Sequence, residues 1–255
     1  MQDFTRYPLV VFVFSFALMW LSTWFGASVL RKWRGMDEGM RDDFNTILAA
    51  TLTLLGLIIG FTFSMAITRY DQRKNYEEEE ANAIGTSYAR ADLLPAADGA
   101  KVRALLKSYL DQRVLYYTSQ NAAELQQANA DAARLQNQLW SAVVAPATAQ
   151  PTPVIALAVA GMNDVLNTQG YTQAAWWNRI PVAAWGLMLA IAVVSNLLIG
   201  YGLRGGTAGT KLLLVVPVVV AIAFMLIADI DAPRRGVIRV SPQNLLTLVE
   251  SLRTP

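Results

Sequence analysis

The sequence predicts an all-α polytopic membrane protein with four transmembrane helices and a helical extramembrane domain. Three observations predict this fold class. The 255 residues are 54% apolar and only 16% charged, outside the norm for soluble domains. Four uncharged stretches approach or exceed the length that spans a hydrocarbon core of about 30 Å, at about 1.5 Å per residue. The polar region between the second and third stretches has helical periodicity and no alternating run typical of a strand.

Residues 1–68 are predicted to hold the first two transmembrane helices. The first, Pro8–Leu30, is longer than the apolar region of a signal peptide, which is about 7–15 residues. It ends on Arg31 and Lys32, so we expect a retained span. The second span is Ile47–Thr68.

Residues 69–179 are predicted to form the helical extramembrane domain. No proline or turn cluster interrupts residues 46–94, so one long helix should leave the membrane and end at Pro95, since proline disfavours a helical residue before it. Three further helices are expected: one capped by Asp98 and running to Ser119, one opened by Asn121 and broken at PATAQPTP, and a short one over VIALAVAGMNDVLNTQ.

Residues 180–228 are predicted to hold the third and fourth spans, Ile180–Leu203 and Leu212–Ala228, with a kink at Pro217. Residues 229–255 form a C-terminal amphipathic segment, because Ser241 followed by Pro242 is a strong helix-start signal. The Lys and Arg tallies on the two sides of the membrane nearly cancel. The positive-inside rule therefore leaves the orientation open.

Composition restricts the chemistry available to this chain. It has no cysteine and no histidine, which removes thiolate nucleophiles, disulfides, the commonest zinc ligands and the commonest general base. We expect neither an enzyme nor a cofactor or metal site, and the net charge of +2 gives no reason to expect nucleic acid as a partner. Asp229 and Asp231 are too few for calcium, which takes about 6–8 oxygens. They are expected to pair with Arg234 or Arg235, or to cap the turn.

The second span has two distinct faces. A stripe of small residues, suited to close helix packing, consists of Gly56, Gly60 and Ser64. The opposite face is apolar and consists of Leu54, Ile58, Phe61 and Met65. If several copies surround an axis, this apolar face would line a constriction in a pore. The alternative, that it meets lipid or another helix, stays open.

Polar residues beyond and within the spans have two interpretations each. Glu77–Glu80 fan around a helix, so we expect a solvated face, with pairing to Arg69, Arg73 or Lys74 compatible with it. In a symmetric oligomer the candidates for a polar or acidic ring are Glu77, Glu78 and Asn82. Ser195 and Asn196, inside the third span, are expected to make interhelical hydrogen bonds rather than a transport site.

Two segments resemble a known family. GFTFSMAITRYDQRKNYEEEEANAIGTSYARADLLP, residues 60–95, and IDAPRRGVIRVSP, residues 230–242, are similar to the bacterial bestrophin-like family, a domain of unknown function distantly similar to the bestrophin anion channels. The resemblance covers nearly the whole chain. It implies a bestrophin-like fold, a bacterial inner (plasma) membrane location, and a pentameric channel whose neck falls at Ile58–Met65. The acidic calcium-binding run of bestrophins is replaced here by Val237, Ile238 and Arg239, which argues against calcium gating.

The leading functional hypothesis is therefore an oligomeric membrane ion channel, with five copies as the expected number. Its apolar neck would be lined by the second span, and its partners would be membrane lipids, further copies of the chain and permeating ions. The alternative is a non-conducting membrane scaffold or sensor that binds a protein partner through the helical domain.

Overall fold

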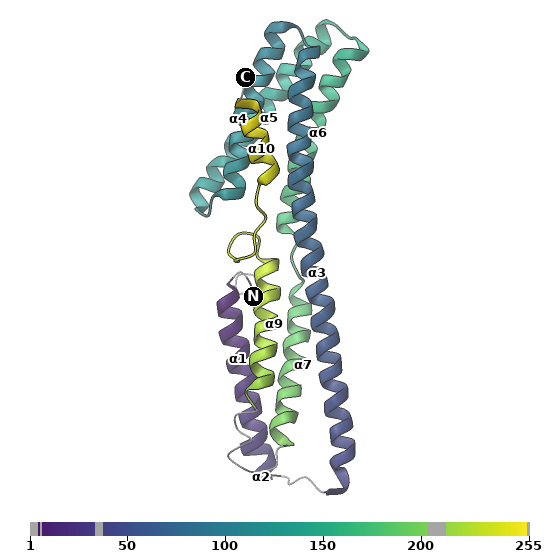
Figure 1. The fold of residues 1–255 in the computed structure, drawn as a ribbon, viewed down its shortest axis with the longest axis vertical. Helices are drawn as coiled ribbons and strands as arrows, with labels where there is room; N and C mark the ends of the chain where they lie inside the picture. Colours follow the sequence, from purple (N-terminus) through teal and green to yellow (C-terminus); the bar gives the residue numbers. More distant parts are fainter. Residues whose placement is uncertain (1–4, 6, 34–37, 203–212, 254–255) are drawn as a thin grey trace. The chain divides into compact units, whose positions relative to one another are not determined.

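The computed structural model describes residues 5, 7–33, 38–202 and 213–253, and these residues form helices with no strand among them. Figure 1 shows the chain as a succession of helices. They cluster into two compact units. We call Met1–Tyr70 with Arg179–Arg239 the apolar unit, and Asp71–Asn178 with Val240–Pro255 the polar unit. The all-α prediction is confirmed for the described residues.

The apolar unit contains four long helical segments. They are α1 (Pro8–Phe25), the first part of α3 (Arg41–Arg90), α7 (Val182–Tyr201) and α9 (Val215–Asp231). A π-helical turn, Gly26–Leu30, and the short α2, Arg31–Trp33, follow α1. Helix α1 packs against both α7 and α9. Their shared core includes Met19, Met188 and Phe224, all at most 1% exposed.

Three helical stretches are long and apolar enough to cross a membrane. They are Pro8–Trp33, Arg41–Leu93 and Pro153–Tyr201, and the last of them contains α6 and α7 in succession. Helix α9 has 17 residues and is not among them. The reason for expecting a kink at Pro217 does not apply. Pro217 lies in the first turn of α9, where a missing N–H costs no helical hydrogen bond. The predicted start of this span at Leu212 lies outside the described residues.

The polar unit contains the rest of α3 and four further helices. They are α4 (Ala96–Thr118), α5 (Ala122–Ala149), α6 (Pro153–Trp177) and α10 (Gln243–Arg253). As predicted, the long helix ends before Pro95, through a 3-10 turn at Ala91–Leu93. Asn121 caps α5 as expected, with its side chain accepting from the Ala123 N–H.

Helix α5 continues through Pro146 and ends at Ala149, inside the PATAQPTP segment that was predicted to break it. Two details of the polar unit differ from the prediction. Asp98 lies in the first turn of α4, and Pro95 takes the capping position instead. Helix α6 runs past the predicted end at Gln169 to Trp177. Helix α4 packs on α5 and on α10, and α5 packs on α6.

Candidate functional site

In the apolar unit, α3 uses one face to pack against its own chain. Leu55, Thr62 and Ala66 are at most 4% exposed. Their spacing of four and seven residues places them on one side of a helix. Leu55 and Ala66 join the core formed by α1, α7 and α9, and Ile58 packs against that core from the side. Ile58, predicted to line a pore, is thus half-buried within its own chain.

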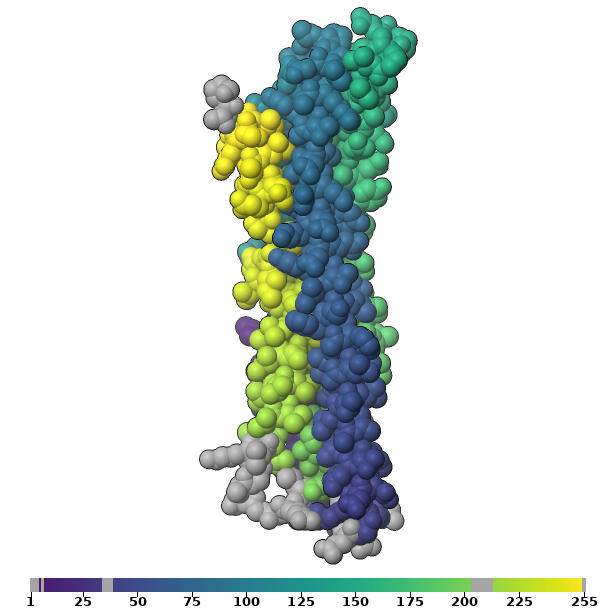
Figure 2. All heavy atoms as spheres, turned by 45° about the vertical axis from the view of Figure 1, so that its right-hand side comes forward, coloured from purple at the N-terminus to yellow at the C-terminus, as the bar shows by residue number. Residues whose placement is uncertain are grey.

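Two other faces of this segment stay exposed, the predicted apolar face and the predicted small-residue stripe. Leu54, Phe61 and Met65 are 45%, 63% and 41% exposed, although they are large and apolar. Gly56 and Gly60 also lie open, since an added Cβ would meet nothing within 4 Å at either position. The predicted packing stripe therefore contacts no helix of the described chain. Figure 2 shows that one side of α3 is uncovered at the surface of the chain. Within the part of the chain that the structure describes, no helix covers this apolar surface.

The third span carries a buried polar contact, as expected. Thr23 of α1 donates to the Asn196 side-chain oxygen of α7 at 3.3 Å, and Asn196 is fully buried. Asn196 in turn donates to the Ala192 carbonyl. The interhelical prediction is confirmed for Asn196, whereas the Ser195 hydroxyl bonds to Ile191 within its own helix.

Two acids at the end of α9 organise the adjoining backbone. Both carboxylate oxygens of Asp231 accept from the Ile180 N–H at 3.3 Å, and Arg69 of α3 approaches at 3.7 Å. The carboxylate of Asp229 accepts from the Val237 and Ile238 N–H groups, each at 2.8 Å. The prediction that one acid caps the turn is confirmed for Asp229. Both of its carboxylate oxygens are thus used by backbone donors.

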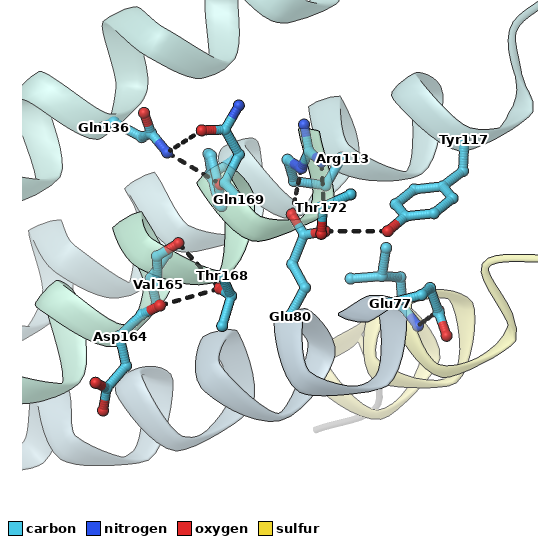
Figure 3. A network of polar contacts seen from close by, with 12 residues as sticks. Glu77, Glu80, Arg113, Tyr117, Gln136, Asp164, Val165, Thr168, Gln169 and Thr172 are labelled. Carbon is cyan, nitrogen blue, oxygen red and sulfur yellow. Dashed lines mark hydrogen bonds and ion pairs between the residues drawn. The ribbon is translucent and has the colours of Figure 1, made fainter. Parts of the chain in front are cut away.

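In the polar unit, Glu80 of α3 is the centre of a buried network. Its carboxylate forms an ion pair with Arg113 of α4 and accepts from the hydroxyls of Tyr117 and Thr172, at 3.3 and 3.2 Å. Figure 3 shows these side chains converging on Glu80 from α4 and α6. Glu80 is fully buried and Arg113 is 1% exposed. The expectation of a solvated face is therefore wrong for Glu80.

Glu77, one turn earlier, is also buried, and it holds the start of α10. Its two oxygens accept from the Leu245 N–H at 2.9 Å and from the Asn244 amide at 2.7 Å. The first N–H groups of a helix lack intrahelical partners, so a carboxylate is well placed there. Glu77 is 1% exposed, and both of its carboxylate oxygens accept hydrogen bonds within its own chain. It is therefore not a candidate for an acidic ring. Glu78 and Asn82 are exposed and remain candidates.

Arg73 is a structural residue that the sequence reasoning did not single out for this role. It is 1% exposed and donates to the Ala175 and Asn178 carbonyls at 3.2 and 3.3 Å, at the end of α6. A signal for it was present. Arg73, Glu77 and Glu80 are separated by four and three residues and continue into Ile84, so they share one helix face with an apolar residue.

The network perturbs the tyrosines around it. Burial raises the pKa of the Tyr117 hydroxyl above its ordinary value, and the nearby Glu80 carboxylate raises this pKa further. Burial likewise raises the pKa of Tyr109, again with a contribution from Glu80. Both hydroxyls therefore stay protonated and neutral. No group of three or more metal-ligating side chains occurs among the described residues.

The fold and these sites define an all-α protein with long apolar helices of the kind that cross membranes. The model of the bestrophin-like domain matches residues 13–245, so the chain belongs to the bestrophin-like family. The family resemblance predicted from the two segments is thereby confirmed.

Solved structures agree with this fold. A mutant of a bacterial bestrophin homolog from Klebsiella pneumoniae superposes with a TM-score of 0.69 at 13% identity, covering 95% of this chain and 98% of that one. A second structure of the Klebsiella homolog, phased with zinc, gives 0.67 at 13% identity and covers 94% and 96%. At this identity the likeness establishes the fold alone. Among curated proteins, none matches the chain.

Proposed function

We propose that the protein is a ring-shaped homo-oligomeric ion channel of the membrane, with α3 lining the pore and five copies as the expected number. Helices α1, α3, α7 and α9 would be the four spans of each copy. The 17 residues of α9 extend about 26 Å at 1.5 Å per residue, near the lower length limit for a transmembrane helix. Residues 215–228 carry no charge, which fits this role.

The observation that carries the proposal is that α3 is buried on one side only. One side packs into the core of its own copy, and the other is exposed despite being apolar. A helix that lines a central pore needs this arrangement, because its outer side meets its own subunit and its inner side meets the axis. The bestrophin-like family membership supports the same reading.

Burial also refines which residues would face the axis. At about 100° per residue, Leu57 and Ser64 lie roughly opposite the buried Leu55, Thr62 and Ala66. Phe61 is nearby and 63% exposed, so it would form the apolar neck with Leu57. On this reading Leu54 and Met65 sit on the flank and meet the neighbouring copy. Ile58, turned toward its own core, leaves the lining set.

Outside the apolar unit, Glu78 and Asn82 would form the polar rings. Both are exposed on α3, whereas Glu77 is engaged by α10. A ring of carboxylates favours cations in a channel. Glu78→Gln should therefore shift the reversal potential measured in a salt gradient toward lower cation preference, while Asn82→Asp should shift it the other way.

The direct test is conduction by the purified protein in planar bilayers. Phe61→Ala should raise the single-channel conductance, since it removes bulk from the neck. Phe63→Ala is the matched control, because Phe63 lies on a flank of α3 and its truncation should leave conductance unchanged. Absence of conductance over a range of salts and voltages would refute the channel. A monomeric or dimeric particle that purifies with a stoichiometric protein partner would instead support the scaffold alternative.

A further inference from the structure

The polar unit has a large open groove between α4 and α5. Its volume is about 760 Å³, and Lys101 and Arg134 lie along it. The other lining residues are uncharged: Leu105, Ala133, Asn137, Gln138 and Ser141. Arg134 pairs with Asp131, whereas Lys101 has no ion pair within the described part of the chain. We call this feature the α4–α5 groove. Both of its charged side chains are basic.

A ridge of opposite character runs along α6. Leu157, Asp164 and Tyr171 follow one another at intervals of seven residues, so they lie along one face of the helix, and all three are exposed. Leu157 is 50% and Tyr171 54% exposed, which is high for such side chains. We call these three residues the α6 ridge. Beside it, Glu79 of α3 lines a smaller groove of about 380 Å³ together with Asp164 and Tyr171, and no Lys or Arg lines that groove.

The α6 ridge and the α4–α5 groove lie at opposite edges of the polar unit. Helix α4 packs on α5, and α5 packs on α6. Glu80 of α3 closes the bundle by contacting Arg113 of α4 and Thr172 of α6. The helices therefore follow one another around the bundle in the order α3, α4, α5, α6. The edge between α3 and α6 lies across from the edge between α4 and α5, so one copy can present both surfaces at once.

We infer that the α6 ridge of one copy docks in the α4–α5 groove of the next copy. Ridge-into-groove packing is the common way for helices to associate. Asp164, with Glu79 close by, would face Lys101 and Arg134, and the apolar Leu157 and Tyr171 would lose their exposure to water. Two different surfaces of the same chain make a head-to-tail contact, which closes into a ring when the rotation permits. This inference rests on the proposed ring and names the surfaces that hold it together.

The test uses the absence of cysteine from the chain as a clean background. The double variant Asp164→Cys with Lys101→Cys, oxidised mildly in detergent, should give a ladder of covalent multimers on a non-reducing gel, ending at the subunit number of the ring. Each single variant should give dimers at most. The matched control pairs Asp164→Cys with Lys107→Cys, because the Lys107 amine lies over the Tyr88 ring of α3 at 5.7 Å, away from the groove. This control should give no ladder.

Charge exchange provides a second measurement. Lys101→Glu alone should shift the particle measured by native mass spectrometry toward smaller assemblies, and adding Asp164→Lys should restore the full assembly. If the intact protein is a ring but the first cysteine pair gives no ladder, the docking surfaces are wrong and the ring stands. If the intact protein is monomeric, or carries a different protein at this groove, both the docking and the ring are refuted.

Discussion

Glu80 on α3 and Arg113 on α4 form an ion pair that is closed to water, with both side chains at most 1% exposed. Two hydroxyls satisfy one carboxylate oxygen further, and the Arg113 guanidinium lies 4.4 Å from the centre of the Tyr116 ring. The pair joins α3 to α4 within the polar unit. Because both charges are removed from water, deleting either side chain would leave the other as an uncompensated buried charge.

Removing one member should therefore be costly. Arg113→Met leaves the Glu80 carboxylate buried without its counter-ion, and such changes cost about 3–5 kcal/mol. We expect a large fall in the midpoint of thermal or denaturant unfolding of the detergent-solubilised protein. Arg253→Met is the control, since the pair of Arg253 with Asp111 is exposed and such pairs contribute about 0–1 kcal/mol. Equal effects of the two variants would contradict the burial of the Glu80–Arg113 pair.

Most of the helices could be predicted from local sequence, and the partners of the acidic run could not. Apolar runs, Pro95 and Asn121 are local signals that act within a few residues, so the long helix, its end and the start of α5 were predictable. Glu80 and Arg113 are 33 residues apart and Glu77 and Leu245 are 168 apart. No local rule gives such pairings. The periodicity of α3 could only have indicated that Glu77 and Glu80 share a face with Ile84.

The faces of the second span illustrate the same limit. The sequence separates a small-residue stripe from an apolar one, but it does not say which side meets the rest of the chain. That choice depends on where α1, α7 and α9 pack, and they bury Leu55, Thr62 and Ala66 between the two predicted stripes. For this reason the sequence did not reveal that Ile58 packs against that core. Pro217 was misjudged because its effect depends on where α9 begins.

Glu77 should control the attachment of α10. Glu77→Ala removes the acceptor for the Leu245 N–H and the Asn244 amide, so the start of α10 loses its anchor. We expect faster amide hydrogen exchange across residues 243–253, with exchange in α5 unchanged. Glu78→Ala is the control, because Glu78 is exposed and has no bond to α10. Protection of α10 that survives Glu77→Ala would show that its packing on α4 alone holds it.

Tyr117 should make stability fall at alkaline pH. Burial raises its pKa above the ordinary value of 10.0, so the folded state holds the proton more tightly than the unfolded state does. The resulting stabilisation is complete below about pH 10 and is lost as the pH rises through the folded pKa. Tyr117→Phe should flatten the decline in unfolding midpoint as the pH rises above about 10. Tyr109 should maintain part of the slope, since its pKa is raised as well. An unchanged slope in the Tyr117→Phe, Tyr109→Phe double variant would refute this origin.

Gly200 on α7 should tolerate no side chain, because the backbone of α1 passes directly against it. An added Cβ would overlap the Thr23 carbonyl oxygen and come within 3.0 Å of the Ala27 nitrogen, and neither atom can move without shifting α1. Gly26, on the facing side, is similarly constrained, with the Tyr201 nitrogen at 2.9 Å.

Gly200→Ala should consequently destabilise the apolar unit by about 1–3 kcal/mol or more, the typical cost of overpacking. Gly186→Ala, on the same helix, is the matched control, because its Cβ would meet nothing within 4 Å. There the higher helix propensity of alanine should leave stability unchanged or raise it by up to about 1 kcal/mol. Unfolding of both variants in the same detergent measures the difference directly. If Gly200→Ala were as stable as Gly186→Ala, the close crossing of α1 and α7 would be wrong.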